Sequence, residues 1–358
     1  MSVRLSPRTA LAAALVALAA CGGSDPNAGG QPFNAATTNT TVAAVNGALE
    51  SPQMNAFRAL SATFGPALGA TQSPVVTALQ EATSEGPARG AFGSARALTQ
   101  LAAAAATGIP TVARGKTFEW STQLNRYVAG SRAGAPAAGV RFILYSAGPG
   151  DRTPTLPLAE IGRVDLIDES NGNAIRFRII GVAGQVEFLN YLVSGTGSND
   201  NGTFTVAGSV RNGNDAVDFT VNATFTLNAQ LVGRVRAEYT INVPSRQYTS
   251  TATVVVDFGA QGLTGVSYGV QMTVGGTNIA VSGAITSPSA PALTLEVRVN
   301  SALFATISTG ANGITVAGAN GRTLTTDERQ AIEKVGDLVD RTSQLLDELL
   351  APVEALLG

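Results

Sequence analysis

The stretch AVDFTVNATFTLN, residues 216–228, alternates apolar and polar side chains without a break. Its apolar positions are Val217, Phe219, Val221, Ala223, Phe225 and Leu227. Successive side chains of a β-strand point to opposite faces of a sheet, so this period of two predicts a strand that buries one face and exposes the other.

The same alternation recurs on both sides of this stretch, for example at residues 235–243, 248–258, 266–274 and 293–299. Clusters of turn-forming residues, such as DESNGN at 168–173 and RNGND at 211–215, separate the alternating runs. Short turns between consecutive strands are typical of an antiparallel meander. We therefore expect eleven to thirteen strands in one antiparallel sheet over residues 116–322.

Helical patterns flank this region. Residues 42–110 contain short helices with start signals: Ser51 precedes Pro52, Ser73 precedes Pro74, and an alanine-rich segment follows at 87–107. In the first of these, Met54, Phe57, Leu60 (or Ser61) and Phe64 line one side. A serine cap followed by proline at the first helical position is a typical helix start.

Residues 323–358 predict a C-terminal amphipathic helix. Thr325 and Glu328 have the spacing of a capping box. One apolar stripe follows, made of Ile332, Val335, Leu338, Val339, Leu345, Leu346, Leu349, Leu350 and Val353. A stripe of this length either pairs in a coiled coil or covers the protein's own sheet, and we favour the sheet.

The predicted fold class is therefore mainly β with flanking helices (α+β). An apolar sheet face needs a cover, because such a face is an aggregation hazard in water. The sheet either closes into a barrel or stays open, as a large curved meander or half-barrel covered by the N- and C-terminal helices. The helical stripes favour the open, covered sheet.

The N-terminus reads MSVRLSPR and then TALAAALVALAA, with the chain's single cysteine at position 21. A basic start, a short apolar run and small residues are typical of a secretory signal. The tetrapeptide Leu18-Ala19-Ala20-Cys21 resembles the lipobox of bacterial lipoproteins. This resemblance implies a signal peptide at 1–20, lipidation of Cys21 and membrane anchoring. Because Gly22 replaces the aspartate that retains family members at the inner membrane, it also implies an outer-membrane location, on the periplasmic or the surface face.

Residues 21–41 are rich in Gly, Ser, Asn, Thr and Pro, and we expect them to form a flexible tether. The chain has no histidine, carries a formal net charge of −2, and has Lys116 and Lys334 as its only lysines. These features argue against an enzyme, a metal site and a nucleic-acid partner, and we expect no cofactor.

Several short motifs have both a chemical and a structural interpretation. GVSYG at 265–269 matches the nucleophile-elbow pattern, but Ser267 lies in a strand-like stretch and lacks a histidine partner. RGKT at 114–117 lacks the first glycine and the following helix of a phosphate-binding loop. Several acidic residues in or near turns could supply oxygen ligands to calcium, but no stretch matches a calcium-binding loop, and we favour a role in the hairpin turns. These residues are Asp165, Asp168, Glu169, Asp200, Asp215 and Asp218.

Two further groups of side chains have a possible binding role. Phe118, Trp120 and Tyr127 flank a hairpin-like segment and form either a sugar-stacking platform or, as we favour, a core pair across two strands. Five arginines stand at polar strand positions and either meet an anionic partner or form a solvated face, which we favour: Arg163, Arg176, Arg178, Arg236 and Arg298.

Two functions rank above an enzyme, which is the third alternative from the sequence. The first is an envelope lipoprotein that binds or carries an apolar ligand or lipid, since a curved antiparallel sheet closed by helices resembles periplasmic lipid and lipoprotein carriers in fold pattern alone. The second is a structural or surface-interaction lipoprotein with a filled core. No ligand-binding residue can be assigned from the sequence.

Overall fold

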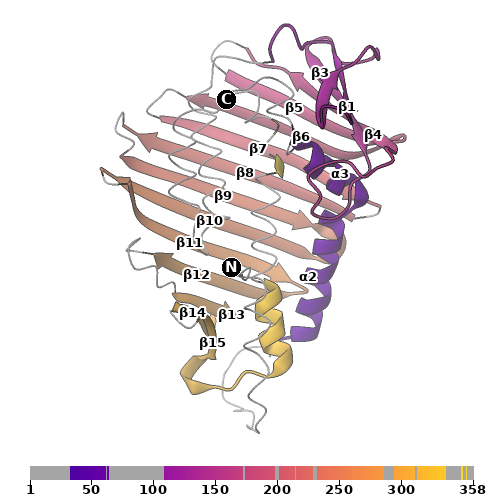
Figure 1. Ribbon diagram of the computed structural model, residues 1–358. Coiled ribbons are helices and arrows are strands. Elements are labelled where there is room, and N and C mark those ends of the chain that lie inside the picture. Colours follow the sequence, from indigo (N-terminus) through magenta and orange to yellow (C-terminus); the bar gives the residue numbers. More distant parts are fainter. Residues whose placement is uncertain are drawn as a thin grey trace, which may run out of the picture.

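The computed structural model describes residues 33–61, 63, 109–171, 174–197, 201–213, 215–228, 232–260, 262–285, 294–310, 313–335, 348, 349 and 352. Fifteen strands form a single sheet whose order is β15-β14-β13-β12-β11-β10-β9-β8-β7-β6-β5-β4-β3-β1-β2 (Figure 1). The sheet is open, because β15 and β2 lie at its opposite ends. The predicted fold class, mainly β with flanking helices, is confirmed.

The strands follow the chain as a meander from β3 onwards, and each of these pairs is antiparallel. Their bounds are β1 (Thr117–Ser121), β2 (Arg126–Ala129), β3 (Gly139–Tyr145), β4 (Glu160–Asp168), β5 (Ala174–Ala183), β6 (Val186–Gly197), β7 (Asn201–Asn212), β8 (Asp215–Leu227), β9 (Gly233–Val243), β10 (Tyr248–Gly259), β11 (Gly262–Val274), β12 (Thr277–Ile285), β13 (Thr294–Val299), β14 (Ala302–Gly310) and β15 (Gly313–Gly318).

Two features differ from the predicted meander. The sheet has more strands than the eleven to thirteen expected, and β1 pairs in parallel with β3, because the β1–β2 hairpin folds back beside β3. Hairpin chemistry predicts that β1 and β2 pair with each other, but not which edge of the hairpin joins the rest of the sheet.

In β7, β8 and β9, the apolar phase of the strand lies on one face of the sheet, which we call the inner face, and the polar phase lies on the outer face. In β8, Val217, Phe219 and Val221 are buried, whereas Asp218 and Asn222 are exposed. The alternation that predicted the strand therefore also predicted which side chains enter the core.

Glycines on the inner face make room for large side chains of adjacent strands. Gly208 of β7 stands between Tyr191 of β6 and Phe219 of β8, and the centroids of these two rings lie 6.0 Å apart. A Cβ atom at position 208 would overlap the carbonyl oxygen of Asn190 and the Cβ of Tyr191. The absence of a side chain at Gly208 thus lets the two rings pack across β7.

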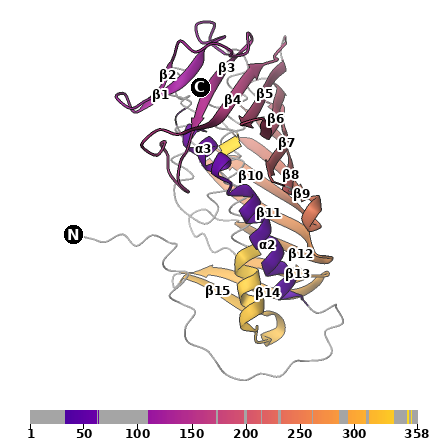
Figure 2. The same ribbon diagram turned by 90° about the vertical axis from the view of Figure 1, so that its right-hand side faces the viewer.

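Helix α2 (Ala35–Leu49) runs along one side of the sheet, across the hairpin ends (Figures 1 and 2). The side-chain amide of Asn212, the last residue of β7, donates to the carbonyl oxygen of Gly47 (3.3 Å). A stripe of buried side chains, Ala35, Thr38, Val42, Val45 and Leu49, has helical spacing. Contacts of α2 reach β7, β8, β11 and the 3-10 turn η1 (Pro244–Arg246).

The helix α2 corrects the expected tether at residues 21–41, because residues 35–41 are helical. Asn34 caps the helix: its side-chain oxygen accepts a hydrogen bond from the backbone N–H of Thr37 (3.0 Å). The composition of this segment, rich in threonine, disfavours a helix in isolation, but burial of the α2 stripe on the sheet stabilises it. Residues 21–32 lie outside the described residues.

Helix α3 (Pro52–Ser61) begins as predicted. The hydroxyl oxygen of Ser51 accepts a hydrogen bond from the backbone N–H of Met54 (3.2 Å), and Pro52 is the first helical residue. Met54, Phe57, Leu60 and Ser61 are buried, as the spacing predicted. Phe64, the helix start at Ser73-Pro74 and the alanine-rich segment 87–107 lie outside the described residues.

Near the C-terminus, residues 326–335 are helical, and the predicted capping box forms. The Thr325 N–H donates to the Glu328 carboxylate (2.9 Å), and the Glu328 N–H donates to the Thr325 hydroxyl (3.2 Å). Ile332 and Val335 of the predicted stripe are buried in the core. The remaining stripe residues, apart from the helical Leu349, lie outside the described residues.

Leu349 connects the C-terminal segment to the centre of the inner face. The Tyr191 hydroxyl donates to its carbonyl oxygen (2.6 Å), and the Leu349 side chain is fully buried. The neighbouring Glu348 accepts from the Arg58 guanidinium of α3 (2.6 Å). Two elements far apart in the chain, α3 and the C-terminal segment, are thus joined to each other and to β6.

Candidate functional site

The predicted lipidation site, Cys21, lies outside the described residues. The described chain begins at Phe33, whose ring packs edge-on against Phe304 of β14 with a centroid distance of 5.0 Å. The described part of the chain therefore begins beside β14. Within the described residues, no helix is long and apolar enough to span a bilayer.

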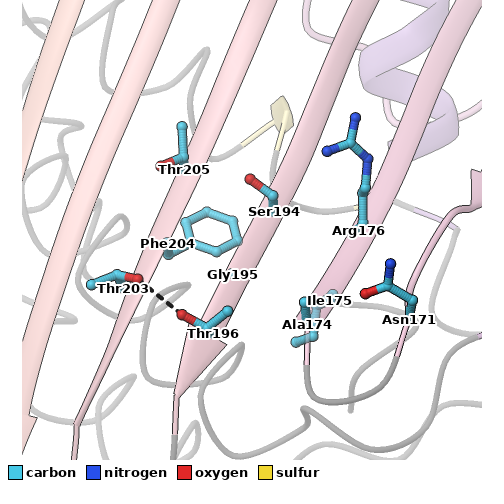
Figure 3. A pocket seen from close by; sticks show the side chains of 10 residues that line it. All are labelled: Asn171, Ala174, Ile175, Arg176, Ser194, Gly195, Thr196, Thr203, Phe204 and Thr205. Atoms are coloured by element: carbon cyan, nitrogen blue, oxygen red, sulfur yellow. Dashed lines mark hydrogen bonds between the residues drawn. The ribbon is translucent and has the colours of Figure 1, made fainter.

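An open hollow of about 250 Å³ lies on the sheet where β5 and β7 begin and β6 ends (Figure 3). It was not predicted from the sequence. The residues that line it are Asn171, Ala174, Ile175, Arg176, Ser194, Gly195, Thr196, Thr203, Phe204 and Thr205.

The polar groups of this hollow largely bind one another or a neighbour. The hydroxyls of Thr196 and Thr203 are hydrogen-bonded at 3.2 Å, and the Arg176 guanidinium donates to the carboxylate of Glu169 (2.9 Å). The Phe204 ring is buried, so its face is closed to a stacking ligand. The hollow offers a shallow hydroxyl-lined surface without a free charge or an aromatic platform.

The five arginines considered for an anionic partner each have a carboxylate within ion-pair distance. Arg176 and Arg178 both bind Glu169, at 2.9 and 2.8 Å. The remaining pairs are Arg163 with Asp165, Arg236 with Glu238, and Arg298 with Glu296. These pairings neutralise the guanidinium charges locally, so the outer face presents a polar surface rather than a cationic one.

Of the acidic residues considered for calcium, Asp165, Asp168, Glu169 and Asp215 bind arginines or backbone groups, and Asp218 is exposed on the outer face of β8. Asp165 accepts two hydrogen bonds from Arg141, at 2.6 and 2.7 Å. Asp168 accepts from the Ile109 N–H (3.3 Å) and from Arg114 (3.0 Å). Asp200 lies outside the described residues. Among the residues that the structure describes, no three acidic, histidine or cysteine side chains are grouped closely enough to hold a metal ion.

Two carboxylates have depressed pKa values. Hydrogen bonds from Arg178 and Arg176 lower the pKa of Glu169. Hydrogen bonds from Arg246 (2.9 Å) and Ser245 (2.7 Å) lower the pKa of Asp215. In both cases the bonds stabilise the charged carboxylate.

Because the folded state lowers the pKa of Asp215, its contribution to stability is present above about pH 4 and is lost as the pH falls through the folded-state pKa. We expect Asp215→Asn to lower the free energy of unfolding by about 0.5–1 kcal/mol at pH 7. The difference in the free energy of unfolding between this variant and the wild type should disappear in acid. Urea denaturation of both proteins across this pH range measures it, with Asp218→Asn on the same strand as the control. A difference that is constant with pH would contradict the assignment.

The aromatic hairpin is part of the core. Phe118 and Trp120 lie on β1 and Tyr127 on β2, and all three are buried. Trp120 and Tyr127 are cross-strand partners with a centroid distance of 5.3 Å, and Phe118 stacks on Phe142 at 4.9 Å. The core-pair interpretation is therefore confirmed over the sugar platform.

Ser267 occupies an exposed, outer-face position in the middle of β11, as the strand interpretation predicted. A nucleophile elbow needs a sharp turn from strand to helix, which this position lacks. At the other rejected motif, Arg114 and Gly115 lie in a turn and Thr117 begins β1, so a strand follows rather than a helix.

The inner face itself is almost closed to water over the middle of the sheet. The buried side chains of β6 to β9 include Val193, Val206, Val217, Val221 and Ile241, each at most 1% exposed. A ligand cavity would leave its lining side chains accessible, so this part of the core is filled by protein atoms.

Towards the other end of the sheet, the burial is less complete. A row of apolar side chains crosses β11 to β15 in register on the inner face: Tyr268 lies opposite Gly283, and Leu295, Ile307 and Val316 follow on successive strands. Tyr268, Leu295, Ile307 and Val316, which we call the β11–β15 row, are only partly buried.

No protein-family model, curated protein or solved structure matches this chain.

Proposed function

We propose that this chain is a lipid-anchored lipoprotein of the bacterial cell envelope, held at the outer membrane through Cys21, with a non-catalytic folded part that serves as a structural and surface-interaction platform. The observation that carries this proposal is the filled core. The apolar face is occupied by the chain's own side chains over β6–β9, which leaves the polar outer face as the surface for partners.

The chemistry of the outer face narrows the partner class. The five arginines considered above are each paired with a carboxylate, and threonine and asparagine side chains bond across strands, such as Thr205 with Asn222 (3.1 Å) and Thr273 with Asn278 (2.9 Å). A surface with neutralised charges and many hydroxyls suits a neutral polar partner better than a polyanion.

A second candidate, binding of an apolar ligand or lipid, is favoured by the β11–β15 row. Its half-buried side chains form a continuous apolar line that reaches the edge of the sheet. An acyl chain lying along this row would bury the remaining apolar surface. If this candidate is correct, a lipid should co-purify with the protein, whereas the filled-core platform predicts that none does.

The lipid anchor has its own test. We expect the wild type to incorporate radiolabelled palmitate when it is expressed with its own N-terminus in a bacterial host, because the cysteine thiol is the only acceptor of this kind in the chain. Cys21→Ser should abolish the label, and Ser24→Ala, which keeps the thiol, should retain it. A label that persists in Cys21→Ser, or a wild type that takes up none, would overturn the anchor.

A further inference from the structure

The two edges of the open sheet differ in their protection. Exposed edge strands invite pairing with other chains, and proteins guard them with charges, proline, bulges or very short strands. The edge strand β2 has four residues and carries the exposed Arg126. Beyond it, Arg132 binds Glu119 (3.0 Å) and Glu160 (2.9 Å), which adds further charge at this edge.

The strand β15 lacks such devices. Its sequence, GITVAG at 313–318, contains neither a charge nor a proline, and its pairing with β14 runs without a bulge. Among the described strands it pairs with β14 alone. Thr315 and Ala317 are exposed on its outer face, and Val316 is half-buried on its inner face. One row of backbone hydrogen-bonding groups at this edge therefore has no strand partner within the described sheet.

A second observation points to the same edge. The β11–β15 row of half-buried apolar side chains ends at Val316, on β15 itself. The row therefore ends at β15, the strand that has backbone hydrogen-bonding groups without a strand partner in the described sheet. Apolar area and strand hydrogen-bonding capacity thus occur together at one place.

We propose that β15 pairs with β15 of a second copy of this chain, antiparallel about a two-fold axis, so that the two sheets continue into one another. Directly opposite residues of paired strands have their side chains on the same face of the sheet. In a symmetric pair, one residue therefore lies opposite its own counterpart, and near the middle of β15 this residue is Thr315 or Val316. In the register centred on Val316, the half-buried Val316 side chains of the two copies lie opposite one another. No like charges oppose one another, since β15 carries none.

The unequal edges favour a closed dimer over a filament. Head-to-tail association would place the uncharged β15 against β2 and its neighbouring ion pairs, and would continue without limit. Pairing of β15 with β15 of a second copy satisfies the β15 edges of both copies in one symmetric contact. The second copy also extends the β11–β15 row across the axis, which shields its end from water.

Analytical ultracentrifugation of the full chain in a mild detergent tests the proposal. We expect the wild type to be a dimer at protein concentrations between about 1 and 100 µM. The double variant Thr315→Lys/Ala317→Lys should be a monomer, because it places charges on the exposed face of the edge strand. Thr251→Lys adds the same charge to the exposed face of an interior strand, and should leave the dimer intact.

A measurement on the wild type alone supports this test. Hydrogen exchange of the β15 amides should slow as the protein concentration rises, while exchange in β2 should not change. A wild type that is monomeric throughout, a double variant that is still dimeric, or exchange in β15 that is independent of concentration would each overturn the proposal. A monomer with a bound lipid would overturn it in favour of an acyl chain on the row.

Discussion

Gly208→Val is expected to destabilise this protein by at least about 3 kcal/mol, or to prevent its folding altogether. The reason is steric. Any side chain at position 208 overlaps the backbone of Asn190 and the Cβ of Tyr191, and neither can move without a shift of β6 against β7. The substitution also removes the space across which Tyr191 and Phe219 contact each other.

The matched control is Gly269→Val. Gly269 lies on the outer face of β11, and a Cβ atom there meets nothing within 4 Å. Valine favours strands, so this variant should be neutral or slightly stabilising. Urea denaturation followed by circular dichroism compares the two variants. Equal stability of Gly208→Val and Gly269→Val would mean that the inner face is loosely packed around β7.

The protein is also expected to lose stability steeply in alkali. Burial raises the pKa of Tyr191 well above its ordinary range and that of Tyr248 to about 12, and it raises the pKa of Tyr127 further still. Above about pH 10 the unfolded chain releases these phenolic protons while the folded chain keeps them, so unfolding becomes more favourable as the pH rises.

Each such tyrosine lowers the free energy of unfolding by about 1 kcal/mol between pH 10 and 11, where only part of the unfolded chains has lost the phenolic proton, so the three together lower it by about 3 kcal/mol. Lysine and arginine add little to this slope, because Lys116 and Lys334 are the only lysines and arginine stays charged in this range. Burial also raises the pKa of Tyr145, which adds to the slope in the same direction. Urea denaturation at a series of pH values measures the slope.

Tyr191→Phe provides the control for this slope. The variant loses the hydrogen bond to the Leu349 carbonyl and should be less stable at pH 8. Its stability should nevertheless fall less steeply above pH 10, by about 1 kcal/mol less between pH 10 and 11, because one of the buried titrating groups is gone. An unchanged slope in Tyr191→Phe would show that this side chain is not buried as a neutral phenol.

Local patterns predicted much of this fold. The alternation in residues 216–228 assigned both the strand and its buried side chains, and Ser51-Pro52 and the Thr325–Glu328 capping box marked two helix starts. These succeeded because strand alternation and helix caps depend on residues close together in the chain.

The failures involve partners distant in the chain. The segment 35–41 resembles a tether by composition. It folds as part of α2 because Ala35 and Thr38 are buried by residues distant in the chain, which a local sequence pattern does not identify. The parallel pairing of β1 with β3 likewise depends on how a hairpin docks. One signal was available but unused: Gly208 occupies the apolar phase of its strand, which is typical of a glycine covered by rings on adjacent strands.

The candidate site could be predicted less well than the fold. The five outer-face arginines were assigned to the correct face by alternation, but their carboxylate partners include Glu169, which lies outside the strands and binds two of them at once. The hollow on β5–β7 depends on the ends of three strands in register, which no local pattern encodes.

We expect that the chain's own side chains, rather than a ligand, fill the space over the apolar face of β6–β9. Native mass spectrometry of the full chain, released from membranes in a mild detergent and followed by organic extraction, tests it most directly. We expect the mass of the lipid-modified chain, as monomer or dimer, with no further stoichiometric component. A second lipid or other apolar molecule bound in stoichiometric amount would contradict the filled core and establish the carrier function instead.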